Sequence, residues 1–497
     1  MSCSEGTRNK RGSSIMRNLT LLTDLYELTM MQGYFFCKDA NEEVIFDMFY
    51  RKNPDGNGFA VSAGLEQVVD MINDLHFSDD DIEYLRSLKM FKEEFLEYLH
   101  DFKFTGSVYA IEEGRVMFER EPVIKVIAPI MQAQLIETAL LNIINHQSLI
   151  ATKAYRVCHA ARPDGVMEFG LRRAQGPDAG IYGARAAMIA GCVATSNVLC
   201  GQMFDVPVAG THAHSWIMSF KDELTAFRTY AEMYPDACIL LVDTYDTMKS
   251  GVPNAIKVFT EMREKGIKSK KYGIRFDSGD LAYLSKKAKK MLDDAGFTDA
   301  VISASNDLDE DLIMSLKLQG ATINSWGVGT NLITSKNQPS FGGVYKLAAI
   351  KNKEDGTWIP RIKKSENTEK ITNPGNKVIK RIYDKETGKL MADLICLEHE
   401  EYDVNKDLTL FDPVETWKKT KLPGGSYIME DLLKPVFIDG ECVFEKIPVM
   451  QLRQRFIEEL DTLWEESKRL INPHKIYVDL SKELWETRNR LLEESTH

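Results

Sequence analysis

The stretch ACILLVDTY, residues 237–245, joins an apolar run to polar residues that follow it directly. A short apolar run of this kind is typical of a buried strand. NAIKVFTEMREKG, at residues 254–266, has apolar residues at helical spacing, and YGIRFDSGD, at residues 272–280, repeats the strand pattern. Strand, helix and strand in this order indicate a βαβ unit, whose two strands lie parallel in one sheet.

The same alternation extends toward both ends of the chain. Strands of this series are predicted at residues 166–172, 203–211, 237–245, 272–280, 300–307 and 322–330. Polar residues or a glycine stand at the strand ends, namely Arg172, Thr211, Asp243, Asp277, Ser305 and Gly329. In a parallel α/β barrel, these ends meet on the face that carries catalysis. The pattern therefore predicts an α/β enzyme.

The length of 497 residues predicts two or three domains, because one hydrophobic core does not grow to this size. An antiparallel pattern with EEG and EREP turns precedes the parallel series, and amphipathic helices end the chain. The expected parts are a disordered lead-in at residues 1–17, an N-terminal α+β domain at 18–165 whose first helix packs on the barrel or on a partner, an α/β barrel at 166–346, and a C-terminal region with strands and terminal helices at 347–497.

The composition excludes several functional classes. The formal net charge of -12 argues against a nucleic-acid-binding protein, which usually presents a basic face. No apolar stretch has the length of a membrane span, and the N-terminus lacks the apolar centre of a secretory signal. The eight cysteines form no CxxC pair, so we expect free thiols in a reducing compartment, the cytoplasm.

Two histidines stand one residue apart in GTHAHSW, residues 210–216. On a strand, His212 and His214 would point the same way and could bind one metal ion, as in a metal-dependent barrel hydrolase. Such a hydrolase needs further ligands, and every later histidine follows the barrel series. The other interpretations are one phosphate-handling imidazole with a structural neighbour, or two packed histidines.

Three more segments suit anionic ligands. Arg172 and Arg173 lie at a strand end in EFGLRRAQG, where they either bind phosphate or carboxylate, or are a solvated pair, or one of them pairs with Glu168. RFDSGDL, residues 275–281, offers a cation and two carboxylates, although one residue there is expected to cap the next helix. SWGVGT, residues 325–330, is either a phosphate-binding loop or a plain turn.

Ten motifs in this order resemble the nicotinate phosphoribosyltransferase family. They are LTLLTDLYELTM, FYRKNP, EFGLRRAQGPDAG, ATSNV, GTHAHSW, VDTYDT, RFDSGDL, GVGTNLI, GGVYKL and KITNPGNK, between about Asn18 and Lys380. The resemblance implies an irregular parallel α/β barrel of the type II phosphoribosyltransferase kind, packed against an N-terminal sheet domain. It also implies a homodimer whose active sites take residues from both subunits.

The implied reaction joins nicotinate to 5-phosphoribosyl 1-diphosphate, giving nicotinate mononucleotide and diphosphate in the salvage of NAD. The resemblance also implies that ATP is hydrolysed during this transfer through a phosphohistidine, which makes the enzyme ligase-like. It places that phosphohistidine at His214. By the same resemblance, Tyr26, Thr211 and Arg275 contact nicotinate, and Thr372 contacts the phosphoribosyl substrate. Tyr26 is expected to serve the barrel of the partner.

Simple chemistry assigns roles to the remaining candidates. Arg275 would meet the nicotinate carboxylate, and Asp277 would hold the ribose and stabilise the positive charge on its reacting carbon. Arg172 and Gly329 would bind the phosphates, together with Mg²⁺ that enters with the substrates rather than on protein ligands. Nicotinamide and quinolinate are the competing acceptors: nicotinamide lacks the carboxylate, and quinolinate needs more cations.

Overall fold

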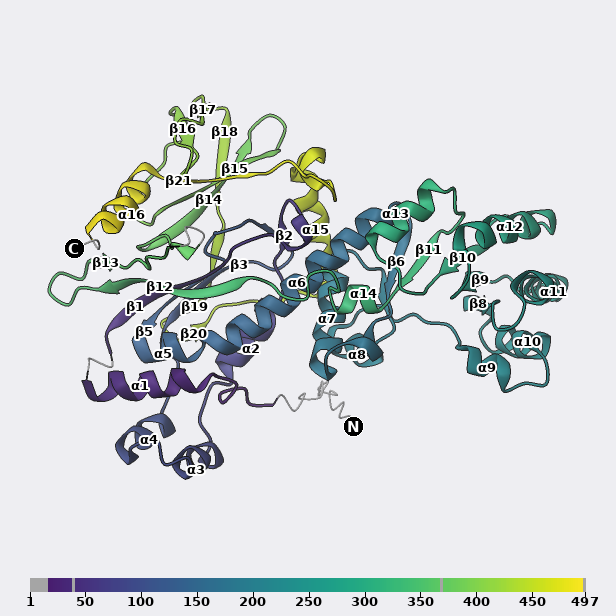
Figure 1. The fold of residues 1–497 in the computed structure, drawn as a ribbon, viewed down its shortest axis with the longest axis horizontal. Helices are drawn as coiled ribbons and strands as arrows, with labels where there is room; N and C mark the ends of the chain where they lie inside the picture. Colours follow the sequence, from purple (N-terminus) through teal and green to yellow (C-terminus); the bar gives the residue numbers. More distant parts are fainter. Residues whose placement is uncertain (1–16, 38–40, 367–369, 495–497) are drawn as a thin grey trace, which may run out of the picture.

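A computed structural model describes residues 17–37, 41–366 and 370–494. Figure 1 shows two lobes joined by the long helix α6 (Glu137–Ala161), one built on antiparallel sheets and the other on a parallel sheet. The predicted lead-in at residues 1–17 lies outside the described residues except for Arg17. Within the described part of the chain, no helix is both long and apolar enough to cross a membrane.

The first lobe contains a seven-stranded sheet in which every neighbouring pair of strands is antiparallel. In spatial order the strands are β13 (Trp358–Pro360), β12 (Gly343–Lys351), β1 (Glu43–Tyr50), β5 (Ile124–Pro129), β3 (Ser107–Ile111), β19 (Leu433–Ile438) and β20 (Glu441–Cys442). The antiparallel pattern predicted before the barrel is thus confirmed. The predicted boundary between residues 346 and 347 stays a prediction, and β12 runs through it.

Helices and a small ribbon surround this sheet. They are α1 (Leu25–Cys37), α2 (Leu65–Asn73), α3 (Asp79–Ser87), α4 (Glu93–His100), α5 (Ile130–Leu135) and the ribbon of β2 (Ala60–Val61) and β4 (Val116–Met117). Apolar side chains of α2, α4, α5 and α6 pack with those of β1, β3 and β5 in one buried cluster. This cluster is the core of the first lobe.

The C-terminal region adds a four-stranded sheet beside the first. Its strands are β18 (Tyr427–Asp431), β14 (Lys377–Asp384), β15 (Leu390–Leu397) and β21 (Tyr477–Leu480), followed by the ribbon of β16 (Leu408–Phe411) and β17 (Lys419–Leu422). The two terminal helices predicted from the sequence are α15 (Val449–Thr462) and α16 (Lys482–Glu494). Helix α16 packs on β15, and α15 packs on a helix of the parallel lobe.

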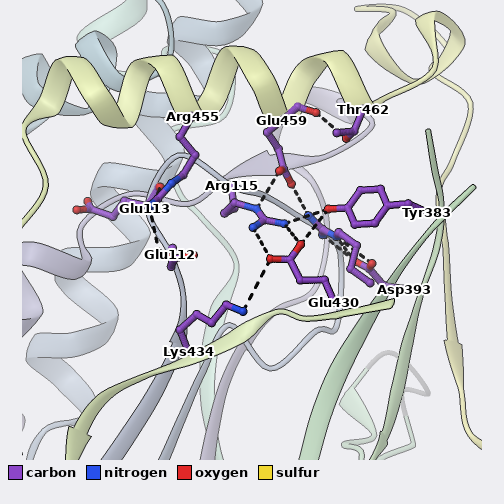
Figure 2. A network of polar contacts seen from close by, with 11 residues as sticks. Glu112, Glu113, Arg115, Tyr383, Asp393, Glu430, Lys434, Arg455, Glu459 and Thr462 are labelled. Atoms are coloured by element: carbon purple, nitrogen blue, oxygen red, sulfur yellow. Dashed lines mark hydrogen bonds and ion pairs between the residues drawn. The ribbon is translucent and has the colours of Figure 1, made fainter. Parts of the chain in front are cut away.

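A network of ion pairs, most of it buried, joins the C-terminal sheet to the segment before β4 and to helix α15 (Figure 2). Arg115 forms ion pairs with Glu430 and Glu459, both at 2.8 Å. Arg381 donates from Nε and Nη2 to Asp393, and from Nη1 to Glu459. Because all these carboxylates face guanidinium groups, burial does not leave unpaired charges, and the network fixes three segments that are distant in sequence.

The parallel sheet of the second lobe has six strands. In spatial order they are β7 (Ala194–Thr195), β6 (Gly165–Glu168), β11 (Ser325–Val328), β10 (Val301–Ala304), β9 (Tyr272–Phe276) and β8 (Cys238–Leu241). The helices of this lobe are α7 (Pro177–Ile189), α8 (Val198–Phe204), α9 (His214–Met218), α10 (Glu223–Met233), α11 (Val252–Glu264), α12 (Leu281–Asp294), α13 (Glu310–Leu318) and α14 (Thr330–Ile333). The predicted parallel α/β organisation is confirmed.

This sheet is curled into a half-barrel rather than a closed ring. Its edge strands β7 and β8 do not pair, and the strand predicted at residues 203–211 is wrong. Residues up to Phe204 belong to helix α8, and Pro207, which has no N–H, allows only an isolated bridge of Val208 to Thr195. The ring of His212 then accepts the N–H of Leu241 in β8 at 3.3 Å, so an irregular segment spans the gap between the edges.

Candidate active site

His214 begins helix α9 at the carboxyl edge of the parallel sheet. Its Nδ1 lies 3.0 Å from the Thr244 hydroxyl, after β8, and its Nε2 lies 3.8 Å from Oδ2 of Asp277, after β9. The side chains of His214 and Asp277 are 39% and 38% exposed. An oriented imidazole beside a carboxylate, both open to a ligand, is suited to proton or phosphoryl transfer.

Two aspartates fix the loop after β9. Oδ2 of Asp243 accepts the backbone N–H of Asp277 at 2.7 Å and the hydroxyl of Ser278 at 2.8 Å. The hydroxyl of Ser305, after β10, donates to Oδ1 of Asp277. Oδ1 of Asp243 is buried and has no hydrogen-bond partner among the described residues. Each aspartate thus keeps one oxygen for a ligand, and such oxygens suit ribose hydroxyls or Mg²⁺.

Arg275 lies in β9, and its Nη2 donates to the backbone oxygen of His212 at 2.9 Å. Its Nε is buried without a hydrogen-bond partner in the described structure. Burial lowers the pKa of this guanidinium, whereas Asp277 and Asp243 raise it and the positive charge of Arg172 lowers it. Arginine nevertheless stays protonated in proteins, so its buried, unpaired N–H group favours an anionic ligand.

His212 differs from His214 in its burial and in its contacts. Its side chain is buried, its Nε2 accepts the N–H of Leu241, and its ring centroid lies 4.6 Å from that of Tyr230. Burial lowers the pKa of His212 to about 4, so the ring is neutral near pH 7. Nε2 of His212 is thus engaged, whereas its Nδ1 is buried without a hydrogen-bond partner among the described residues. The described part of the chain contains no group of three or more His, Cys, Asp or Glu residues arranged to bind a metal.

Arg172 lies in a short helical turn, Leu171–Arg173, directly after β6. Glu168, at the end of β6, is buried and accepts the N–H of Gly170 and the hydroxyl of Thr195. The alternative in which Glu168 pairs with the arginines is therefore wrong. Gly329 precedes α14, and a Cβ there would lie 3.1 Å from the carbonyl oxygen of Phe169. A side chain at this position would therefore require the neighbouring strand end to shift by a few tenths of an ångström.

The structure brings together most of the predicted site residues within one chain. The hydroxyl of Thr211 donates to the backbone oxygen of His212, which also binds Arg275. Tyr26, by contrast, is exposed on α1, which lies at the opposite end of the molecule from α9 (Figure 1). Thr372 is buried between the sheets of the first lobe, where its hydroxyl accepts the N–H of Lys363 at 3.2 Å.

Sequence reasoning missed two contributions to the site. Thr244 was not considered, although VDTYDT places a hydroxyl directly after a strand, and Glu168 was considered only as an ion-pair partner. The expectation that one residue of RFDSGDL caps a helix is confirmed, since Asp280 accepts the N–H of Tyr283 at 2.9 Å at the start of α12. Asp280 is therefore engaged in capping, and Asp277 is the carboxylate of that loop in the site.

Three family models match the chain. They describe the N-terminal domain of nicotinate phosphoribosyltransferase at residues 21–145, the nicotinate phosphoribosyltransferase family at residues 165–399 and the C-terminal domain of the enzyme at residues 376–488. The nicotinate phosphoribosyltransferase of Bacillus subtilis (strain 168) is 46% identical over 477 residues, which is 96% of each chain. The human enzyme is 31% identical over 93% of this chain and 95% of its own.

Solved structures agree with these matches. The crystal structure of human nicotinic acid phosphoribosyltransferase superimposes with a TM-score of 0.81 at 29% identity, covering 95% of this chain and all of that chain. A nicotinate-nucleotide pyrophosphorylase from Pyrococcus furiosus, at 22% identity and a TM-score of 0.68, shares the fold over 92% of this chain and 99% of its own. From its sequence, its fold and the models it matches, the chain belongs to the nicotinate phosphoribosyltransferase family.

Proposed function

We propose that this protein transfers the phosphoribosyl group of 5-phosphoribosyl 1-diphosphate to nicotinate, producing nicotinate mononucleotide and diphosphate for NAD biosynthesis. The observation that carries the proposal is the cluster at the strand ends. There a half-buried arginine, whose Nε is buried and unpaired, lies beside a partly exposed histidine–aspartate pair. Membership of the family supports the same reaction.

Arg275 is the proposed partner of the nicotinate carboxylate, with the Thr211 hydroxyl beside it. A buried guanidinium binds a carboxylate through charge-assisted hydrogen bonds, and its cost of burial is then offset. Nicotinamide has no carboxylate and would leave the N–H of Arg275 unpaired. Quinolinate carries a second carboxylate, and the carboxylates of Asp277 and Asp243 beside Arg275 would repel it.

The phosphoribosyl donor would lie on the aspartates and on the loops after β6 and β11. As diphosphate departs, positive charge develops on the ribose carbon, and Asp277 is placed to stabilise it electrostatically. Arg172 and the backbone around Gly329 would bind the phosphate groups. Mg²⁺ fits this arrangement: Oδ1 of Asp243 is a buried carboxylate oxygen without a partner, and the bound metal would neutralise the charge of the leaving group.

Coupling to ATP is proposed to run through His214. The imidazole attacks the γ-phosphorus of ATP, ADP leaves, and water later takes the phosphoryl group to give inorganic phosphate. Asp277 and Thr244 hold the ring while its nitrogens change their bonding. The support for this step is that His214 is oriented and exposed, whereas His212 is buried, neutral and hydrogen-bonded through Nε2.

A homodimer with shared active sites would bring Tyr26 to the site. Tyr26 is 46% exposed on the lobe opposite to its own half-barrel, together with Leu25 at 49%. In the proposed type II phosphoribosyltransferase arrangement, this face covers the half-barrel of the partner and stacks Tyr26 on the pyridine ring. Mixing Tyr26→Ala chains with His214→Ala chains should restore part of the ATP-stimulated activity by forming one intact site per dimer. No recovery after subunit exchange would contradict the shared site.

The proposed reaction is tested by incubating purified protein with 5-phosphoribosyl 1-diphosphate, Mg²⁺ and nicotinate, nicotinamide or quinolinate, with and without ATP. Mass spectrometry should detect the mononucleotide of nicotinate in preference to the other two, and ATP should increase its yield. The His214→Ala variant should keep a basal rate and lose the response to ATP. Absence of nicotinate mononucleotide would overturn the function, and a full ATP response in His214→Ala would overturn only the role of His214.

A further inference from the structure

A cavity in the first lobe is lined by several basic residues. The turn between β4 and β5, strand β12, residues 371–373 and helix α16 line it. Its volume is about 50 Å³, whereas about 10–15 Å³ on this measure holds one water molecule, so there is room for a group larger than water. Thr372 lines the cavity, as do Arg120 and Arg488.

Arg120 reaches this cavity from a strained backbone. Its φ angle is 70°, in the left-handed region that residues other than glycine and asparagine rarely adopt. Its N–H donates to the backbone oxygen of Tyr50 at 2.8 Å, which fixes the turn. Strain of this kind persists where the surrounding structure imposes it, and it concentrates at ligand sites.

Arg488 approaches from the last helix of the chain. Its Nη1 donates to the side-chain oxygen of Asn373 at 3.4 Å, and its Nη2 donates to the backbone oxygen of Pro413 at 3.2 Å. Its Nε is buried and has no hydrogen-bond partner in the part of the chain that the structure describes. Burial lowers the pKa of Arg488, and the charge of Arg120 lowers it further, so the two guanidinium groups lie within electrostatic reach of each other.

Two carboxylates line the cavity, and one oxygen of Asp47, Oδ1, is buried without a hydrogen-bond partner among the described residues. Asp47 forms an ion pair with Lys377 at 2.6 Å, and Glu119 accepts the backbone N–H of Asn53 at 2.9 Å. Among the described residues, no carboxylate lies within ion-pair distance of Arg120 or Arg488. Two like charges that converge without a counter-ion are costly unless an anion is bound between them.

We propose that Arg120 and Arg488, with the hydroxyl of Thr372, form a binding site for the phosphate group of a small anionic ligand. Guanidinium pairs recognise phosphate oxygens by charge-assisted, bidentate hydrogen bonds. The proposal deepens the substrate role proposed for Thr372 and rests on it when the ligand is 5-phosphoribosyl 1-diphosphate. It also gives helix α16 a function, because this helix delivers one of the two arginines.

The test uses the full-length protein and two variants from separate elements. Arg120→Asn removes the charge with a residue that tolerates a positive φ, and Arg488→Gln keeps the length of the side chain. The matched control is Arg490→Gln, on the same helix but exposed, whose one ion pair among the described residues is with Glu494 at 3.2 Å. Isothermal titration calorimetry with 5-phosphoribosyl 1-diphosphate, ATP and inorganic phosphate gives Kd, and thermal unfolding confirms that each variant is folded.

Each cavity variant should raise Kd for at least one of the three ligands by about tenfold, the effect of losing one charge-assisted hydrogen bond. The KM for nicotinate and the binding by Arg490→Gln should stay at wild-type values. The affected ligand identifies the source of the phosphate: the phosphoribosyl donor, ATP or free phosphate. If both variants bind all three ligands as tightly as Arg490→Gln, the site is overturned. If wild-type protein makes no nicotinate mononucleotide while the variants lose phosphate binding, the proposed function fails and the site stands.

Discussion

The ion-pair network around Arg381 and the charged cluster at the strand ends differ in how their polar atoms are partnered. All three guanidinium nitrogens of Arg381 donate to carboxylates, and its side chain is fully buried. At the strand ends, Nε of Arg275 and Oδ1 of Asp243 are buried without partners, and His214 is more than a third exposed. The satisfied network holds the fold together, and the unsatisfied cluster is prepared for a ligand.

The largest expected effect is a loss in the free energy of unfolding when the ion-pair network around Arg381 is broken. Arg381→Met leaves Asp393 as an unpaired buried charge and removes one of the two guanidinium partners of Glu459, so it should lower the free energy of unfolding by about 3–5 kcal/mol. The matched control is Arg228→Met, which breaks the exposed pair with Glu261 and should cost at most about 1 kcal/mol. Urea denaturation measures both values. Equal losses would mean that the buried network does not stabilise the fold as described.

A change at the strand ends should act on catalysis instead. Asp277→Asn keeps the shape and the acceptor for Ser305 but removes the negative charge, so kcat should fall by about 100-fold with little change in urea stability. Asp280→Asn, in the same loop, should leave kcat and the stability in urea unchanged, because asparagine caps helix α12 as well as aspartate does. A nearly normal kcat for Asp277→Asn would remove this carboxylate from the reaction.

We expect His212 to make the free energy of unfolding depend on pH without taking part in the reaction. Folding lowers its pKa from 6.5 to about 4, so between these pH values the unfolded chain binds a proton that the folded chain does not. Stability due to His212 is therefore lost as pH falls from 6.5 to 4, by up to about 3 kcal/mol. His212→Gln should show a shallower loss of unfolding free energy over this range than wild type or His399→Gln. Identical slopes would place His212 in contact with water.

The parallel lobe was predictable because its signals are local. Each of the strands β8 to β11 is a short apolar run, and the polar residue that follows is placed by the strand itself. The strand predicted at residues 203–211 failed because Pro207 cannot donate to a ladder, and two-residue β7 is too short to give a pattern. Tyr26 and Thr372 were assigned only by resemblance to a family.

The cavity lined by Arg120 and Arg488 was not predictable in the same way. Arg120 and Arg488 belong to no motif, and neither follows a strand of the parallel series. They meet only because helix α16 packs on the C-terminal sheet and this sheet lies beside the seven-stranded sheet (Figure 1). Whether a buried guanidinium has a hydrogen-bond partner depends on tertiary packing. A local sequence pattern does not carry that information.

The recognition of nicotinate by Arg275 is tested most directly by comparing acceptors. Arg275→Ala should weaken the binding of nicotinate by roughly 2–5 kcal/mol, because the carboxylate of the bound acceptor loses its partner. The weaker binding should appear as a higher KM for nicotinate. Steady-state kinetics with nicotinate and nicotinamide should therefore show a steep loss for nicotinate, a much smaller loss for nicotinamide and a narrowed preference between the two. Equal losses for both acceptors would contradict the account and place Arg275 on the phosphoribosyl donor.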